Sequence, residues 1–192
     1  MTTWSLSTEG NVTYIVNTPE SLVALIPDYL NEEQARILFN KCYKNITFSN
    51  IGKRATKWYA KKDYTYGVIK HPADTNMPNF LSDVVKKLNI DFQLRINSVL
   101  CNLYNNGLKY IPFHSDDETV LGPRPTIMSI SLGVNRNFQL KDIASGVITD
   151  TVLNEGSLLI MAKQTQCYYL HSVPPCSTCI KPRINLTFRE IF

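Results

Sequence analysis

The amino-acid sequence predicts an α+β fold that is mainly β, an antiparallel sandwich or barrel with helices packed outside it. Three observations support this prediction. Two segments of the first half show the apolar periodicity of helices, and short β-rich runs follow one another after residue 95. Gly, Pro, Asn and Asp separate these runs, as expected of turns between strands.

Both predicted helices have a defined beginning. In residues 31–43, Asn31 is a candidate N-cap and Gln34 stands three residues later, which is the capping-box pattern. In residues 78–89, Pro78 stands at the entry, where a missing N–H is tolerated. The expected apolar stripes are Ala35, Leu38, Phe39 and Cys42 in the first helix, and Leu81, Val84, Val85 and Leu88 in the second.

The predicted strands lie in the second half of the chain. They are residues 96–104, 126–133, 137–140, 146–153, 156–162, 167–173 and 183–188. The first 50 residues give the weakest local signals, so they are expected to form an accessory layer or a partner site.

Composition is that of an ordinary globular domain. The chain has 192 residues, 44% hydrophobic content and a mean hydropathy of −0.14, which predicts one domain over residues 1–192. No apolar run approaches the ~18 residues of a membrane span, and the first residues do not resemble a secretory signal. The formal net charge of +4 permits a polyanionic partner without demanding one.

The five cysteines are an odd, scattered set. This favours reduced thiols in an intracellular protein, nuclear or cytoplasmic, over a disulfide framework. The "CSTC" run from Cys176 to Cys179 is half of a zinc-site pattern, and its alternative is an ordinary loop. Both interpretations stay open from the residues alone.

A basic run with aromatic residues inside it occupies positions 53–62, "KRATKWYAKK". Such a mixture suits nucleic acid, because cations contact phosphates and rings stack on bases. The alternative is a solvated basic loop whose aromatic residues belong to the core. The residues concerned are Lys53, Arg54, Lys57, Lys61, Lys62, Trp58 and Tyr59, followed by Tyr64 and Tyr66.

A candidate metal site begins in residues 110–118, "YIPFHSDDE". His114 and Asp116 are two residues apart, so an extended segment would point both side chains to one face. With the distant His171 they would form the 2-His-1-carboxylate triad of non-haem Fe(II) oxygenases. The alternative is a surface histidine beside acids and a loop histidine. The third histidine, His71, is expected to be structural or exposed.

The run "RINLTFR" at residues 183–189 alternates strictly between apolar and polar residues. Arginines on the polar face make sense if that face lines a cavity that holds a dianion, since Arg binds carboxylates in a bidentate manner. Asn102 and Tyr104 in "CNLY" also share a face and offer donors to an acid. The alternative for the arginines is structural ion pairing. The polar face consists of Arg183, Asn185, Thr187 and Arg189, and the apolar face of Ile184, Leu186 and Phe188.

These motifs resemble the AlkB family of Fe(II)- and 2-oxoglutarate-dependent nucleic-acid dealkylases. The resemblance covers about residues 53–190 and rests on "NLYNNG", "IPFHSDDE", "MSISLG", "FQL", "GSLLIMAKQTQCYYLHSVPP" and "RINLTFR". It is strongest to the eukaryotic-type DNA-repair and RNA-demethylase branch, where "KWYAKKDYTYG" also has a counterpart. It implies a double-stranded β-helix (jelly-roll) core at 95–192, a nucleotide-recognition lid at 51–75, and an N-terminal extension with a helix at 1–50.

The resemblance also implies the cofactors and the residues of the site. His114, Asp116 and His171 would bind Fe(II), and 2-oxoglutarate would lie among Asn102, Tyr104, Arg183, Asn185 and Arg189. Arg183 is the expected partner of the far carboxylate. Trp58, Tyr64 and Tyr66 would cover the substrate base opposite the His114 ring, with Asp117 and Glu118 at the rim, where Glu118 can pair with Arg189 or meet a cationic base.

The implied reaction is oxidative removal of N-alkyl groups, such as those of 1-methyladenine or 3-methylcytosine, from DNA or RNA, with release of formaldehyde, succinate and CO2. The protein is expected to act as a monomer without a membrane. The segment before the lid offers only Phe48 and Ile51 as wedges, which favours single-stranded substrates. Three alternatives are a hydroxylase of a protein or a small molecule, an RNA N6-methyladenine eraser, and an inactive binding module on the same fold.

Overall fold

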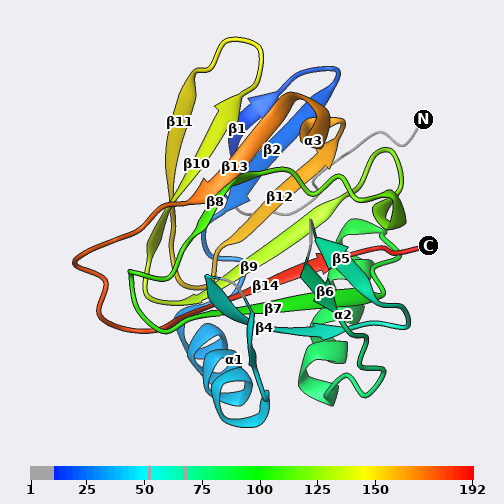
Figure 1. The fold of residues 1–192 in the computed structure, drawn as a ribbon, viewed down its shortest axis with the longest axis vertical. Helices are drawn as coiled ribbons and strands as arrows, with labels where there is room; N and C mark the ends of the chain where they lie inside the picture. Colours follow the sequence, from blue (N-terminus) through cyan, green and yellow to red (C-terminus); the bar gives the residue numbers. More distant parts are fainter. Residues whose placement is uncertain (1–10, 52, 67–68) are drawn as a thin grey trace.

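The structure is a computed structural model that describes residues 11–51, 53–66 and 69–192. Its centre is a pair of antiparallel sheets (Figure 1). The major sheet has the strand order β1-β2-β12-β9-β14-β7-β4-β3, and the minor sheet has the order β11-β10-β13-β8. The strands from β7 to β14 are divided between the two sheets, which is the jelly-roll core that the sequence predicted.

Seven of the strands of this core follow the predicted runs, and β8 was not among those runs. The core strands are β7 (Ser98–Tyr104), β8 (Ile111–His114), β9 (Ile127–Gly133), β10 (Arg136–Asp142), β11 (Ile148–Leu153), β12 (Leu158–Lys163), β13 (Tyr169–Val173) and β14 (Arg183–Arg189). A short helix α3 (Thr165–Tyr168) precedes β13, so the predicted strand at 167–173 begins later than expected. A 3-10 turn, η1 (Thr119–Leu121), follows the candidate metal-site loop.

Helices α1 (Glu32–Asn45) and α2 (Asn79–Phe92) lie against the face of the major sheet that points away from the minor sheet (Figure 1). Asn31 and Gln34 form the predicted capping box, with Asn31 Oδ1 accepting from Gln34 N–H at 2.9 Å. Both helices are therefore confirmed. The apolar face of β14, Ile184, Leu186 and Phe188, is fully buried in the core beneath them.

The first 50 residues hold more sheet than the sequence suggested. Strands β1 (Thr13–Asn17) and β2 (Ser21–Ile26) extend the major sheet, because β2 pairs with β12 over its whole length. Every residue of β2 is buried, so its continuous apolar run lacks the alternation that identifies a half-buried strand. This segment is an integral layer of the core.

The predicted lid segment is divided between two sheets. Strand β4 (Arg54–Tyr59) pairs with β7 and with β3 (Ser49–Ile51), so it is part of the major sheet. Strands β5 (Tyr64–Tyr66) and β6 (Ile69–His71) form a separate two-stranded sheet. Phe48, expected to be exposed, packs against the core, and the side chain of Ile51 lies outside the described residues.

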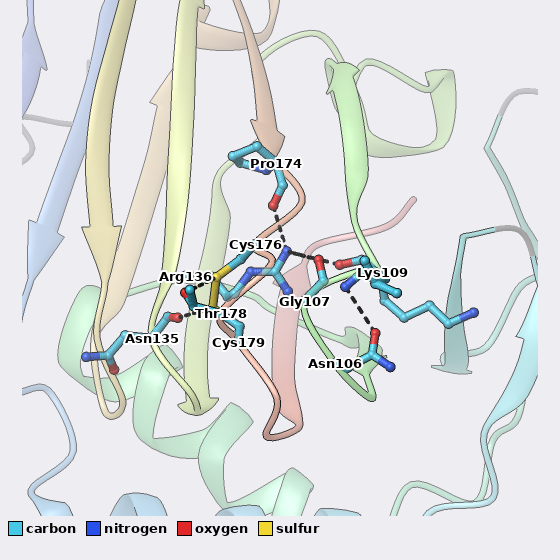
Figure 2. The surroundings of a disulfide bond; sticks show 10 residues. Asn106, Gly107, Lys109, Asn135, Arg136, Pro174, Cys176, Thr178 and Cys179 are labelled. Carbon is cyan, nitrogen blue, oxygen red and sulfur yellow. Dashed lines mark hydrogen bonds between the residues drawn. A yellow bond between two sulfur atoms is a disulfide. The ribbon is translucent and has the colours of Figure 1, made fainter.

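A disulfide joins Cys176 to Cys179 in the loop between β13 and β14 (Figure 2). The expectation that all cysteines are reduced was therefore wrong for this pair, and the paired sulfurs leave no half zinc site. Cys42, Cys101 and Cys167 are free. No helix in the described part of the chain is long and apolar enough to cross a membrane.

Two glycines with positive φ should differ in how much stability is lost when each is replaced by alanine. Gly133 ends β9 with φ +81°, and a Cβ there would lie 2.6 Å from the Pro182 carbonyl oxygen; Gly146 has φ +73° and no heavy atom within 4 Å of such a Cβ. Gly146→Ala should lower the free energy of unfolding by about 1 kcal/mol, from backbone strain alone. Gly133→Ala should lower it by about 2–4 kcal/mol, because a main-chain collision is added. Denaturant unfolding measures both losses of free energy. Equal losses would contradict the expected collision between residue 133 and the Pro182 carbonyl oxygen.

Candidate active site

The two distant histidines meet because β13 pairs with β8. His171 and His114 are direct partners in this antiparallel pair, and their ring centroids are 4.1 Å apart. Asp116 comes two residues later, just past the end of β8. The ligand atoms of the three residues all lie within 4.8 Å of one another, so the predicted triad forms a compact cluster.

Neighbouring groups fix the orientation of each member of the triad. His114 Nδ1 donates to the Pro112 carbonyl oxygen at 2.9 Å, which in a neutral ring leaves the lone pair on Nε2. The backbone N–H of Asp116 donates to Gln166 Oε1 at 2.9 Å, and the ring of Phe138 stacks on His171. Burial lowers the pKa of His171 to about 3, so its ring stays neutral and able to bind a cation.

The carboxylate of Asp116 is held by a buried ion pair. Arg189 Nη2 lies 2.7 Å from Asp116 Oδ2, and both side chains are almost fully buried. Burial by itself would raise the pKa of Asp116, but the attraction of Arg189 and of the two histidines outweighs it and lowers the pKa well below its usual value. Arg189 therefore pairs directly with Asp116, while Glu118, its other expected partner, lies near enough for the two charges to interact.

The polar face of β14 forms a hydrogen-bonded ladder with its neighbours β7 and β9. Asn185 lies opposite Asn102 on one side and Ser131 on the other. Asn185 Nδ2 donates to Ser129 Oγ at 2.6 Å, and Thr187 Oγ1 donates to Asn185 Oδ1 at 2.7 Å. The strict alternation predicted for β14 thus holds, and its polar face lines the same cavity as the triad.

Arg183 lies at the far end of this ladder, buried to 1% exposure. Its Nη2 donates to Ser131 Oγ at 2.9 Å, and its guanidinium lies over the Tyr104 ring at 5.2 Å from the centroid. Its Nε and Nη1 are buried and have no hydrogen-bond partner among the described residues. A buried cation with unused donors facing a cavity fits a carboxylate of an organic dianion, which is what 2-oxoglutarate supplies.

Two residues of the cavity wall were not assigned to it by the sequence. Arg54, counted in the basic run, lines the cavity and donates from Nε to Asn102 Oδ1 at 2.7 Å. His71, expected to be structural or exposed, is buried on the same wall, with Nδ1 3.3 Å from Thr56 Oγ1. The signal for Arg54 is the β-period of "RAT", which puts Arg54 and Thr56 on one face, and the β4–β7 pairing places Asn102 opposite Thr56. His71 joins this wall through its contact with Thr56.

The predicted substrate residues occupy different depths. The ring of Tyr64 lines the cavity and stacks on His71, whereas Trp58 lies in the core behind Tyr64, with ring centroids 5.0 Å apart. Trp58 does not line the cavity, and its Nε1 donates to the Lys62 carbonyl oxygen at 2.8 Å. The side chain of Tyr66 lies outside the described residues.

The two rim carboxylates also differ. Asp117 is exposed, and Glu118 is half-buried and hydrogen-bonded to the Tyr64 side chain. Burial first, and then the charge of Asp116, raises the pKa of Glu118. Its Oε2 has no hydrogen-bond partner in the described part of the chain. The two adjacent acids, both expected at the rim, therefore have different environments.

Comparison with known proteins identifies the family. A model described as the 2OG-Fe(II) oxygenase superfamily matches residues 22–189. The chain belongs to this superfamily. It is therefore a dioxygenase whose cofactors are Fe(II) and 2-oxoglutarate, in agreement with the triad and with the unused donors of Arg183.

Within the superfamily the chain belongs with the AlkB homologues. It is 30% identical over 191 residues to alpha-ketoglutarate-dependent dioxygenase alkB homolog 3 of Bos taurus, covering 90% of this chain and 67% of the relative. It is 34% identical to the Homo sapiens protein of the same name over 72% of this chain and 52% of the relative. It is 36% identical to DNA oxidative demethylase ALKBH2 of Arabidopsis thaliana over 50% of this chain and 38% of the relative.

Solved structures agree on the fold. The structure of OsALKBH1 superposes with a TM-score of 0.63 at 18% identity, covering 88% of this chain and 97% of that one. A Pseudomonas putida prolyl-4-hydroxylase superposes with a TM-score of 0.60 at 15% identity, covering 87% and 90%. At these identities the likeness concerns the oxygenase jelly roll alone.

His71 gives a pH-dependent prediction for the metal-free protein. Burial, and then the charges of Arg54 and Arg189, lower the pKa of His71 to about 4 from its ordinary value of 6.5. Between pH 4 and pH 6.5 the unfolded chain binds more protons at His71 than the folded chain does. The stability that is present above pH 6.5 is therefore lost as the pH falls toward 4. The loss from His71 should be of order 1–3 kcal/mol. The free energy of unfolding is measured with denaturant from pH 7 to 4 in the presence of a chelator. It should fall less steeply with pH in His71→Leu than in the unchanged protein. Identical slopes of free energy against pH would contradict the lowered pKa of His71.

Proposed function

We propose that this dioxygenase removes N-alkyl groups from nucleic-acid bases. One observation carries the proposal. A 2-His-1-carboxylate cluster, an arginine with unused donors and the ring of Tyr64, which follows the basic run 53–62, line one cavity. The names of the relatives support it, since the Arabidopsis thaliana protein is a DNA oxidative demethylase. When bound, Fe(II) with 2-oxoglutarate and O2 supplies the oxidation of an N-methyl carbon, and formaldehyde, succinate and CO2 are the products.

In this proposal the residues of the chain bind and orient the reactants. His114, Asp116 and His171 hold the metal, and Arg189 keeps Asp116 ionised and in place. Arg183 binds the far carboxylate of 2-oxoglutarate. The remaining contacts to the cofactor would come from Asn102, Tyr104, Asn185 and Arg189, all of them buried on one face of β7 and β14.

The substrate base would enter beside Tyr64 and the His114 ring. An aromatic face and a nearby carboxylate both attract a cationic base such as 1-methyladenine or 3-methylcytosine. Glu118 suits this role, because it is half-buried beside Tyr64 with one oxygen unpartnered within the described residues. Trp58 would act indirectly by supporting Tyr64, while the exposed Asp117 would contribute at the rim.

The exposed lysines of residues 53–62 support a polyanionic substrate. Lys53, Lys61 and Lys62 are exposed, whereas Lys57 is neutralised by Asp74 at 2.6 Å. Phe48, one of the two candidate wedges, is partly buried against the core. We therefore propose a single-stranded DNA or RNA substrate, for which no unstacking wedge is needed. The predicted intracellular location and monomeric state remain predictions.

Turnover of a single methylated strand tests the function. With Fe(II), 2-oxoglutarate and O2, an oligonucleotide carrying 1-methyladenine or 3-methylcytosine should lose its methyl group, with equimolar formaldehyde and succinate. The annealed duplex should react more slowly at the same salt concentration, since opening it costs a few kcal/mol. Mass spectrometry of the strand gives the readout, and His171→Ala is the inactive control. A rate of succinate formation that is the same with and without the methylated strand would disprove the proposal. A faster reaction of the duplex would disprove the strand preference.

Arg183 variants test the cofactor assignment. Arg183→Ala should raise the dissociation constant for 2-oxoglutarate roughly a hundredfold, because truncating one partner of a buried charge-assisted pair typically costs about 2–5 kcal/mol. Arg183→Lys should lie between, since it keeps the charge without the planar fork. The affinity for 2-oxoglutarate is measured by calorimetry with Mn(II) in place of Fe(II). An unchanged affinity in Arg183→Ala would contradict the assignment.

A further inference from the structure

We infer that Cys176 and Cys179 form a reversible thiol–disulfide exchange site for dithiols, and that the state of this site controls the affinity of the Arg183 end of the cavity for 2-oxoglutarate. The inference rests on the proposed role of Arg183 and is independent of the nucleic-acid substrate. It explains a feature that the dioxygenase reaction does not use, the disulfide between β13 and β14 (Figure 2).

The position of the disulfide links two parts of the active site. The loop that contains it begins where β13, the strand of His171, ends, and it leads directly into Arg183 at the start of β14. Both cysteines are partly exposed, and they line a surface groove together with Pro175. A dithiol can therefore reach the sulfur atoms from solvent, as exchange requires.

The disulfide loop docks tightly on the segment after β7. The Cys176 N–H donates to the Gly107 carbonyl oxygen at 2.8 Å, and the Gly107 N–H donates to the Cys179 carbonyl oxygen at 2.6 Å. A Cβ built on Gly107 would lie 1.7 Å from the Cys176 carbonyl oxygen, so only glycine permits this approach. The disulfide reinforces the turn that makes this contact, and opening it leaves Cys176 and Cys179 joined by one backbone hydrogen bond, from the Cys179 N–H to the Cys176 carbonyl oxygen at 3.3 Å.

A buried arginine transmits the position of the loop to the cavity. Arg136 Nη2 donates to the Pro174 carbonyl oxygen at 2.6 Å and to the Lys109 carbonyl oxygen at 3.0 Å, so it bridges the two docked segments (Figure 2). Its guanidinium lies 5.6 Å from the centroid of Tyr104, and the guanidinium of Arg183 lies 5.2 Å from the same centroid. Loosening the loop thus removes support from Tyr104, which shapes the surroundings of Arg183.

The exchange step is a two-electron reduction. A thiolate of the dithiol attacks one sulfur of the Cys176–Cys179 bond, and a mixed disulfide forms as the other cysteine leaves as a thiolate. The second thiol of the reagent displaces the first cysteine, so the dithiol becomes a disulfide. Cys176 and Cys179 gain two electrons and two protons in total, and reoxidation by a disulfide reverses the reaction.

The experiment compares the oxidised and reduced full-length protein. Protein is treated with dithiothreitol or with thioredoxin and its reducing system, and each reagent is removed under anaerobic conditions before Mn(II) is added. Alkylation after unfolding should count three thiols before treatment and five after it, because Cys42, Cys101 and Cys167 are the free cysteines. Reduction by either reagent supports the site, and the reagent that acts identifies a small or a protein dithiol as the source.

Calorimetric titration of 2-oxoglutarate into each form then measures the coupling. The dissociation constant should rise about fivefold or more on reduction, the lower end of typical coupling between sites. The double variant Cys176→Ser/Cys179→Ser should bind 2-oxoglutarate as weakly as the reduced protein does. Its dissociation constant should not change on treatment with dithiols. Cys167→Ser, which changes an exposed free cysteine elsewhere, should keep the full response.

Two results would overturn the inference. One is a thiol count that dithiol treatment does not change, and the other is a dissociation constant that stays within twofold among the oxidised, reduced and double-serine proteins. Thermal unfolding of the double variant shows whether it is folded. If Arg183→Ala also leaves the affinity unchanged, the proposed role of Arg183 has failed; if Arg183→Ala weakens binding and reduction does not, only the coupling has failed.

Discussion

The site depends on strand β14 and its strict alternation at the centre of the major sheet. Its apolar residues, Ile184, Leu186 and Phe188, are buried beneath the helices, and its polar residues line the cavity between the sheets. A shift of register by one residue would exchange these faces, placing arginines in an apolar core. The burial that holds β14 in register therefore also places Arg183 and Arg189 in the site.

Charge balance explains why this cavity suits its cofactors. Arg183 and Arg189 are buried, and Asp116 is the carboxylate that pairs with Arg189. A buried cation without a partner is unfavourable, so the unused donors of Arg183 favour binding of an anion. The neutral histidines offer lone pairs and the ionised Asp116 offers a negative charge, and both favour binding of a divalent cation. Metal and dianion thus complete the electrostatics of a site that the fold has already positioned.

The neighbouring connections supply the other functional groups. The β13–β14 loop carries the Cys176–Cys179 disulfide and docks on Gly107, while β4 brings Arg54 into contact with Asn102. Through these contacts the cavity is coupled on one side to a surface loop and on the other to the segment that faces the proposed substrate. Tyr104 lies between the two, because β7 pairs with both β4 and β14.

Features that depend on local pattern could be predicted from the residues alone. The capping box at Asn31 and the alternation of residues 183–189 each predicted an element, and the spacing of His114 and Asp116 predicted two of the three metal ligands. Features that depend on long-range strand pairing became visible in the folded chain. The partner of Arg189, the burial of His71, the place of Trp58 behind Tyr64 and the sheet role of the fully buried β2 follow from strands far apart in sequence. A periodicity shows which side chains share a face, and the packing of another element against that face decides what they contact.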